Sequence, residues 1–150
     1  MPSWKPVLVI TVISGLAIAV IFPDYLSLQT ATLVEDFRGA LGDSDARASA
    51  AAIMDMVFSV SYATLGVVAY RAVTAGVPLL IGTLASIGAG LADEVENVMV
   101  LLNIRAGTDL KQSGVDAMLT AGSVKWGLVV TAIVLLLALA GQRWLEDRRG

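Results

Sequence analysis

Four apolar segments, separated by polar stretches, dominate the hydrophobicity pattern of the chain. They run over residues 7–22, 46–70, 77–104 and 117–140. A transmembrane helix needs about 17–25 mainly apolar residues, because each residue adds about 1.5 Å and the hydrocarbon core is about 30 Å thick. In that core, only a helix satisfies its own backbone hydrogen bonds within an open-ended segment. The pattern therefore predicts a single all-α integral membrane domain, a four-helix transmembrane bundle.

The first apolar segment is the shortest and has two interpretations. Trp4 and Tyr25 flank it as interfacial aromatic anchors would, which favours a membrane span. Lys5 followed by a short apolar core is also a feature of a cleaved signal peptide. The core continues into Phe22 and Pro23 without a small-residue cleavage site, so we expect a span.

The stretch between the first two segments, SLQTATLVEDFRGALG, has a helical apolar pattern. Leu33, Phe37 and Leu41 recur every four residues and Val34 lies beside them, so they form one stripe. We expect a short amphipathic interfacial helix with this stripe on the membrane surface. The alternative is a lid over a functional site on the same side.

The number of spans and the positions of the basic residues bear on topology. An even number of spans places both termini on one side of the membrane. Lysine and arginine are divided evenly between the two sides, but Lys125 lies inside a span and is not a loop charge. We therefore expect a multi-pass protein of the cell inner (plasma) membrane with cytoplasmic termini.

Composition supports the membrane interpretation and excludes several kinds of chemistry. The 150 residues are 57% hydrophobic and 15% charged, whereas soluble domains are about 45–50% apolar and about 25% charged. The chain has no cysteine and no histidine, which excludes thiolate and imidazole catalysis and the metal sites built from them. The net charge of −3 argues against a nucleic-acid partner. No motif predicts a metal site or a cofactor.

Ionisable and polar residues interrupt the third apolar segment. At about 100° per residue, Asp93, Glu96 and Asn97 share one face of a helix, and Glu94 stands at the edge of that face. Gly82, Ser86 and Gly90 form a ridge of small residues in the same segment, and this ridge predicts close helix packing.

The second and fourth segments supply partners for these groups. Asp55, Ser59 and Tyr62 form a polar stripe with Gly66 in the second segment, and Lys125 lies in the fourth. Measured from the loop side, the four charged residues lie at similar depths of about 12–16 Å. They are Asp55, Asp93, Glu96 and Lys125.

The charges in this layer do not balance. At least three carboxyls accompany one ammonium, so at least one carboxyl keeps a proton or binds a cation. This is the condition for a general acid beside a general base, and equally for a proton or cation relay. Asn97 and Ser59 have an alternative role as interhelical hydrogen-bond donors.

The motifs MDMVFSVSY and ADEVEN, with a lysine early in the last span, resemble those of small bacterial four-helix membrane proteins. Such proteins pair an Asp and a Tyr in one span with Asp-x-x-Glu-Asn in the next. The resemblance covers the last three spans and implies a shared architecture, but it carries no activity. The matching residues are Asp55, Tyr62, Asp93, Glu96, Asn97 and Lys125.

We expect a membrane-embedded enzyme or binding protein for an apolar or amphiphilic small molecule held in the bilayer. Isomerisation, cyclisation, epoxide opening or hydrolysis would suit such a site, since none needs a redox cofactor. The expected catalytic residues are Asp55, Asp93, Glu96 and Lys125. The expected substrate-binding residues are Tyr62, Asn97, Ser59 and Glu94.

Two other classes of function stay open. One is a proton- or cation-coupled transporter or channel, and the other is a structural subunit of a larger membrane complex. The polar layer opens toward one face, and the sequence shows no matching groups on the far side, which favours a pocket over a conduction path. A homo-oligomer also stays open.

Overall fold

The computed structural model describes residues 5–148, and Trp4, expected as an interfacial anchor, lies outside them. Every regular element in this range is helical, which confirms the all-α fold class. The elements are α1 (Lys5–Ile21), α2 (Tyr25–Gln29), α3 (Val34–Leu41), α4 (Asp45–Val73), α5 (Gly76–Ala106), the 3₁₀ turn η1 (Gly107–Asp109) and α6 (Gln112–Asp147).

Three of these helices are long and apolar enough to cross a membrane. They are α4, α5 together with η1, and α6. The 17 residues of α1 are also apolar, but at about 1.5 Å per residue they reach only about 25 Å. The structure thus indicates a membrane protein with three candidate spans, and the fourth span stays a prediction.

The ends of the helices agree with the expected ends of the spans to within about three residues, except at the two ends of α6, which begins at Gln112 and ends at Asp147. Pro78 lies in the first turn of α5, where its missing N–H has no helical partner to lose. The last span is expected to end near Ala140, before Gly141, and α6 itself continues to Asp147. One glycine inside a helix costs only about 1 kcal/mol relative to alanine, which a long helix tolerates.

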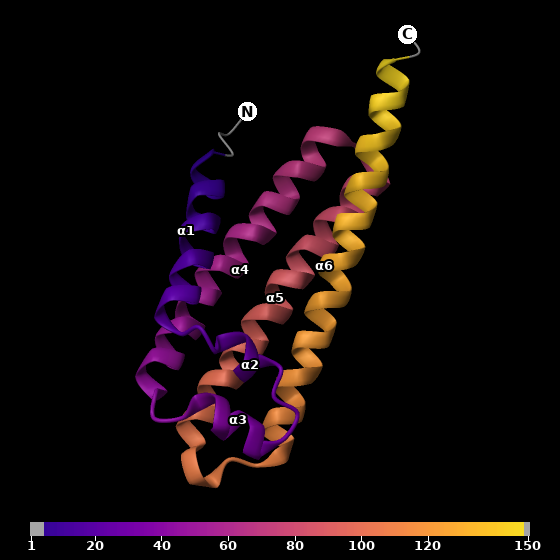
Figure 1. Cartoon of the computed structure of the whole chain (residues 1–150). Coiled ribbons are helices and arrows are strands. Elements are labelled where there is room, and N and C mark those ends of the chain that lie inside the picture. Colours follow the sequence, from indigo (N-terminus) through magenta and orange to yellow (C-terminus); the bar gives the residue numbers. More distant parts are fainter. Residues whose placement is uncertain (1–4, 149–150) are drawn as a thin grey trace.

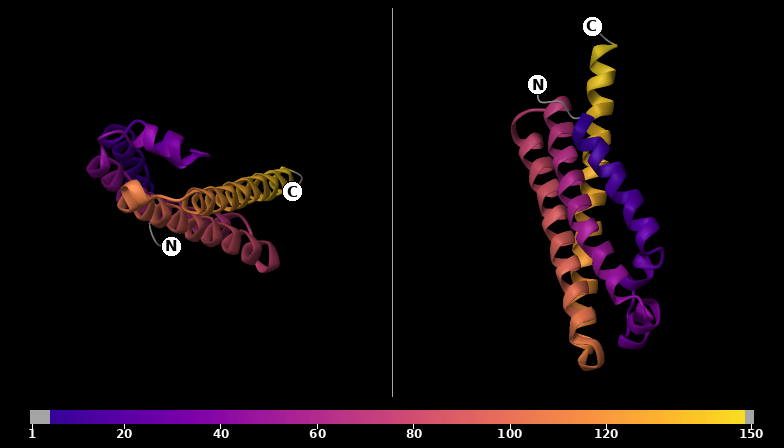
Figure 2. Two further views of the ribbon diagram at one scale, coloured as in Figure 1. Left: turned by 90° about the horizontal axis from the view of Figure 1, so that it is seen from below. Right: turned by 90° about the vertical axis from the view of Figure 1, so that its left-hand side faces the viewer.

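Consecutive long helices are neighbours in space, as Figures 1 and 2 show. Helix α1 packs along α4, α4 packs on α5, and α5 packs on α6, whereas α4 and α6 touch far less. The start of α1 and the end of α6 lie at the same end of the molecule (Figure 1). Helices α2 and α3 cover the opposite end, near the connection from α5 to α6.

Helices α2 and α3 and their connection (residues 25–41, here called the cap) pack against protein. Phe37 is fully buried and Leu41 nearly so, in a core that includes Val100 and Met118. The expectation that this stripe lies on the membrane surface is therefore wrong for these two residues, although Leu33 is exposed. Phe37 and Leu41 pack on an apolar surface of α5 and α6 instead of facing lipid.

Hydrogen bonds also tie the cap to the connection between α5 and α6. The Arg38 guanidinium donates to the carbonyl oxygens of Gly107 at 3.3 Å and Thr108 at 2.9 Å. The Gln112 side chain donates to the carbonyl oxygen of Thr32 at 2.8 Å and accepts from the backbone N–H of Val34 at 3.3 Å. The cap is thus fixed to α6 as well as buried.

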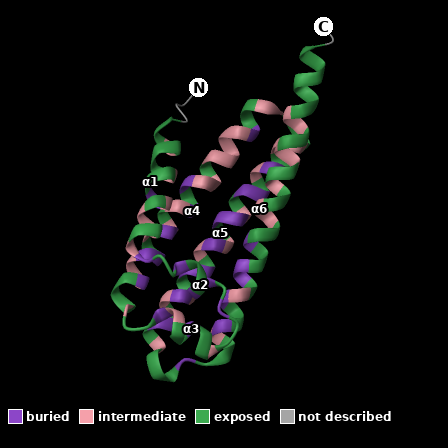
Figure 3. Cartoon of the chain, viewed as in Figure 1, coloured by how far each residue is buried: buried purple, intermediate pink, exposed green. Residues whose placement is uncertain are grey.

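Burial is concentrated at the capped end of the molecule and along α5 (Figure 3). The outward faces of the long helices carry exposed apolar side chains, such as Val20 at 80% and Leu137 at 67% exposure. An exposed apolar surface of this extent suits contact with lipid rather than with water.

The expected ridge of small residues on α5 is confirmed as a packing surface. A Cβ atom at Gly82 would overlap the ring of Tyr70, and one at Gly90 would lie 2.9 Å from the Cβ of Ala63. Ser86 similarly faces Gly66 of α4. The small residues of α5 therefore leave room for the Tyr70 ring and for the close approach of α4 at Ala63 and Gly66.

Candidate functional site

Lys125 of α6 reaches across to two carboxylates of α5. Its Nζ atom lies 3.0 Å from Oδ1 of Asp93, and it forms a second ion pair with Oε2 of Glu96. All three side chains are buried. Gly122, one turn before Lys125, makes room for Glu96, because a Cβ there would lie 2.9 Å from Oε1 of Glu96. The structure thus brings together three of the four expected catalytic residues.

Asp55 of α4 is the fourth, and its partner comes from the cap. The Nε2 atom of Gln29 donates to Oδ2 of Asp55 at 2.9 Å. Asp55 is only 7% exposed, and this hydrogen bond comes from a neutral amide. Within residues 5–148, the ion pairs of Lys125 are with Asp93 and Glu96 and not with Asp55.

Tyr25 and Gln29 of α2 both hold Asn97. The Oδ1 atom of Asn97 accepts a hydrogen bond from the Tyr25 hydroxyl at 2.6 Å and from Gln29 Nε2 at 3.4 Å. Among residues 5–148, the Nδ2 atom of Asn97 has no hydrogen-bond partner. Asn97 therefore anchors the cap over the polar layer.

Tyr25 was expected as an interfacial anchor, and its position is different. It is 4% exposed and faces the protein. Burial first, and then the carboxylates of Asp55 and Glu96, raise the pKa of the Tyr25 phenol above its ordinary value. The phenol consequently keeps its proton and acts as a hydrogen-bond donor to Asn97.

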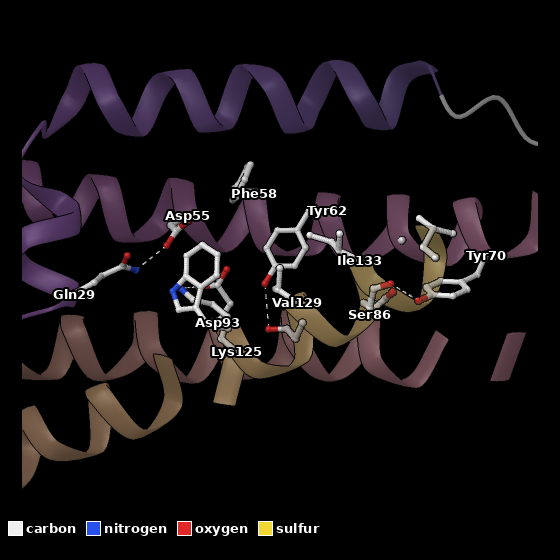
Figure 4. Close-up of a pocket in the computed structure, with 15 residues that line it drawn as sticks. Gln29, Asp55, Phe58, Tyr62, Tyr70, Ser86, Asp93, Lys125, Val129 and Ile133 are labelled. Carbon is white, nitrogen blue, oxygen red and sulfur yellow. Dashed lines mark hydrogen bonds and ion pairs between the residues drawn. The ribbon is translucent and has the colours of Figure 1, made fainter. Parts of the chain in front are cut away.

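A cavity of about 470 Å³ lies between α4, α5 and α6, with α2 at one end (Figure 4). Its charged groups gather at the end near the cap, where Asp55, Asp93 and Lys125 line it beside Gln29. The remaining lining residues are mostly apolar. They are Phe58, Tyr62, Gly66, Tyr70, Ser86, Ala89, Trp126, Val129, Ala132, Ile133 and Leu136.

Two tyrosines of α4 place hydroxyl groups along the cavity. The Tyr62 hydroxyl donates to the carbonyl oxygen of Ala89 at 3.1 Å, and its ring lies beyond the charged end. The Tyr70 hydroxyl donates to the carbonyl oxygen of Ala132 at 2.5 Å. Tyr70 thus joins α4 to α6 at the end of the cavity remote from the cap.

Three expected binding residues do not line this cavity. Ser59 donates to Oε1 of Glu94 at 2.5 Å, and Glu94 lines a separate cavity of about 350 Å³ between α4 and α5. Asn97 lines neither of these two cavities and accepts hydrogen bonds from Tyr25 and Gln29 of the cap. The expectation that Ser59, Glu94 and Asn97 line the same cavity as Asp55 is therefore wrong. The polar residues of α4 and α5 cover a wide arc of each helix, so they face more than one side.

Sequence reasoning missed several residues that the structure places at the site. Gln29 was not expected at the site, although the spacing of Tyr25, Leu28 and Gln29 is that of one helical face. Trp126 was also missed. It lies inside α6 next to Lys125, with the ammonium 5.5 Å from its ring centroid. Tryptophan is usually found near the ends of membrane spans, so its position far from a span end is the signal that could have identified Trp126 as a site residue.

Comparison with known proteins does not assign the chain to a family. No protein-family model, no curated protein and no solved structure matches the chain. Within residues 5–148, no three carboxylates form a group able to hold a metal ion. The cavity has Lys125 and the carboxyls of Asp55 and Asp93 at one end, and the two carboxyls have different surroundings.

Proposed function

We propose that the chain is a membrane-embedded binding protein or enzyme for an apolar or amphiphilic small molecule. One observation carries this proposal: the cavity of about 470 Å³ has charged groups at one end and mostly apolar walls elsewhere. Small-molecule sites typically have volumes of about 300–1,000 Å³, mostly apolar walls and a few placed polar groups. In this proposal the ligand lies along α4 and α6 with its polar part at Asp55 and Asp93.

We further propose that the site performs acid–base chemistry without a redox cofactor. Asp93 lies beside a cation and Asp55 beside a neutral amide, and two carboxyls in unlike surroundings can divide the roles of acid and base. We assign the roles of acid and base to Asp55 and Asp93. Lys125 orients Asp93, and Glu96 balances the charge of Lys125. Isomerisation, cyclisation, epoxide opening or hydrolysis would fit these groups.

The test is to extract and identify small molecules bound to the purified protein and to measure their conversion. Asp93→Asn is expected to retain a bound molecule that the wild-type protein converts. Glu94→Gln is the matched control, because Glu94 lines the other cavity, and it should convert like wild type. If Ile133→Trp, which adds bulk to the cavity wall, left binding and conversion unchanged, the proposal would be overturned.

Proton- or cation-coupled transport is the second candidate. The Tyr62 and Tyr70 hydroxyls extend polar groups along the cavity, away from the charged end. Buried carboxylates opposite a lysine also suit a proton relay. Flux into liposomes separates the two functions, since a pH- or cation-dependent current that is lost in Glu96→Gln would establish transport. Absence of both binding and flux would favour a structural subunit of a larger complex.

For the architecture, we propose that α1 is a fourth span, that the helices form a four-helix transmembrane bundle and that both termini are cytoplasmic. Helix α1 packs along α4, and its outer face is apolar, with Leu16 and Val20 exposed. The chain has no cysteine, so single cysteines report topology directly. In intact cells an impermeant maleimide should label Asp43→Cys, and it should label Gln142→Cys only after permeabilisation. The reverse pattern would place the termini outside.

A further inference from the structure

The cavity has a length and a charge that select one class of ligand. We propose that it takes an amphiphile with a single hydrocarbon chain and a cationic amine head. The head lies between Asp55 and Asp93, and the chain lies along α6. This inference rests on the proposed function and names the class of molecule that the same site holds.

The apolar wall of the cavity fits one hydrocarbon chain. Val129, Ile133 and Leu136 follow one another on α6 at spacings of three or four residues, so they present one face to the cavity. From Lys125 to Leu136 the helix advances about 16 Å. One leaflet of a hydrocarbon core of about 30 Å is about 15 Å thick, so the wall matches the chain of a single-tailed lipid.

The cavity is accessible from the side that faces lipid. Trp126 and Ile133 line it and are also exposed, at 57% and 52%. Helices α4 and α6 touch little, and Tyr70 joins them at the far end. Gln29 closes the other end at Asp55. A molecule already dissolved in the bilayer can therefore enter between α4 and α6 without crossing the cap.

The charges at the polar end select the head group. Asp93 and Glu96 share one ammonium, Lys125, whereas the hydrogen bond to the buried Asp55 comes from a neutral amide. An anionic head would add to the excess of negative charge, and a neutral head would leave it unchanged. An ammonium supplies the missing positive charge and up to three N–H donors. The adjacent Trp126 ring offers a further favourable contact to a cation.

The experiment is a binding measurement on the full chain in nanodiscs of phosphatidylcholine. The protein has three tryptophans, so Trp4→Phe with Trp144→Phe leaves Trp126 as the only tryptophan of the chain. The probes are dodecylamine, dodecanol, dodecanoate and butylamine, which separate the head from the chain. Dodecylamine should bind saturably and more tightly than the other three. Asp55→Asn should weaken it about tenfold or more, and Glu94→Gln should leave it unchanged.

The outcomes distinguish this inference from the function on which it rests. If dodecanol or dodecanoate bound as tightly as dodecylamine, the cationic head would be wrong. The proposed function would survive that result provided that Ile133→Trp still abolished binding. If Ile133→Trp changed no affinity, both would fail. If Asp55→Asn does not fold, the affinities of the four probes for the protein that retains Asp55 still decide the head group.

Discussion

Gln29 of the cap donates a hydrogen bond to Asp55 of α4 across 2.9 Å, and both side chains are buried. This contact links a short helix outside the candidate spans to a carboxyl inside one. The same amide nitrogen also reaches Asn97 of α5 at 3.4 Å. One side chain therefore connects the cap with two of the long helices.

Gln29→Ala should loosen the cap. The substitution leaves the buried Asp55 carboxyl without its amide donor, and an unsatisfied buried polar group costs about 1–3 kcal/mol. Hydrogen exchange followed by mass spectrometry should show faster exchange in residues 25–41 and little change in the middle of α6. Thr30→Ala, which removes an exposed hydroxyl bonded only within the cap, is the control. Unchanged exchange in the cap would contradict the link.

Lys125→Met should destabilise the protein strongly. Removal of one partner from a buried ion pair typically costs about 3–5 kcal/mol, because the remaining charges lose their compensation. Lys111→Met is the matched control, since Lys111 is exposed and should have little effect. Thermal unfolding in detergent measures both. The triple variant Lys125→Met, Asp93→Asn, Glu96→Gln should recover most of the loss, and failure to recover would point to packing rather than charge.

Tyr25→Phe should change the dependence of stability on pH. Near neutral pH the variant loses a hydrogen bond to Asn97 worth about 1 kcal/mol. Burial raises the pKa of Tyr25 in the folded protein. Above the ordinary tyrosine pKa of about 10, the unfolded chain therefore releases a proton that the folded chain keeps, and the wild-type protein loses stability as the pH rises.

The unfolding temperatures of the wild-type protein and Tyr25→Phe should accordingly converge between pH 8 and pH 11. Phenylalanine has no proton to release, so the comparison isolates the contribution of this one phenol from those of the other tyrosines. A constant difference across the range would show that the Tyr25 phenol titrates equally in both states.

Gly82→Ala should destabilise the contact between α4 and α5. The new Cβ would overlap the ring of Tyr70, and overpacking of this kind costs about 1–3 kcal/mol. Gly127→Ala is a matched control on α6, because nothing lies within 4 Å of its Cβ position. That substitution should raise stability by up to about 1 kcal/mol through helix propensity alone. Thermal unfolding in detergent, as for Lys125→Met, measures both, and equal effects would argue against close packing at Gly82.

The meeting of Asp93, Glu96 and Lys125 could be predicted because a helix fixes both the direction and the depth of each residue. Two helices that run antiparallel across one membrane then bring residues of equal depth together. The same reasoning included Ser59 and Glu94 wrongly, because these two residues satisfy each other on another side of the α4–α5 contact. The angular position of a residue on its own helix does not determine which other helix packs against that side.

The cap shows a different limit of the sequence. The stripe with Phe37 and Leu41 is amphipathic whether lipid or protein covers it, so the pattern could not identify its partner. Gln29 could not be placed for a similar reason. Its helix has only five residues, and the orientation of so short an element depends on tertiary contacts with Asn97 and Asp55 rather than on periodicity.

The ion pairs of Lys125 have a consequence for the order of membrane insertion. The lysine follows Asp93 by 32 residues, so at about 5–20 residues per second the ribosome adds it about 2–6 s later. During that interval α5 holds two carboxylates whose counter-ion has not yet been synthesised, and a charge deep in lipid is costly. Helix α5 should therefore remain beside the translocon until α6 arrives, and the two should leave for the bilayer as a pair.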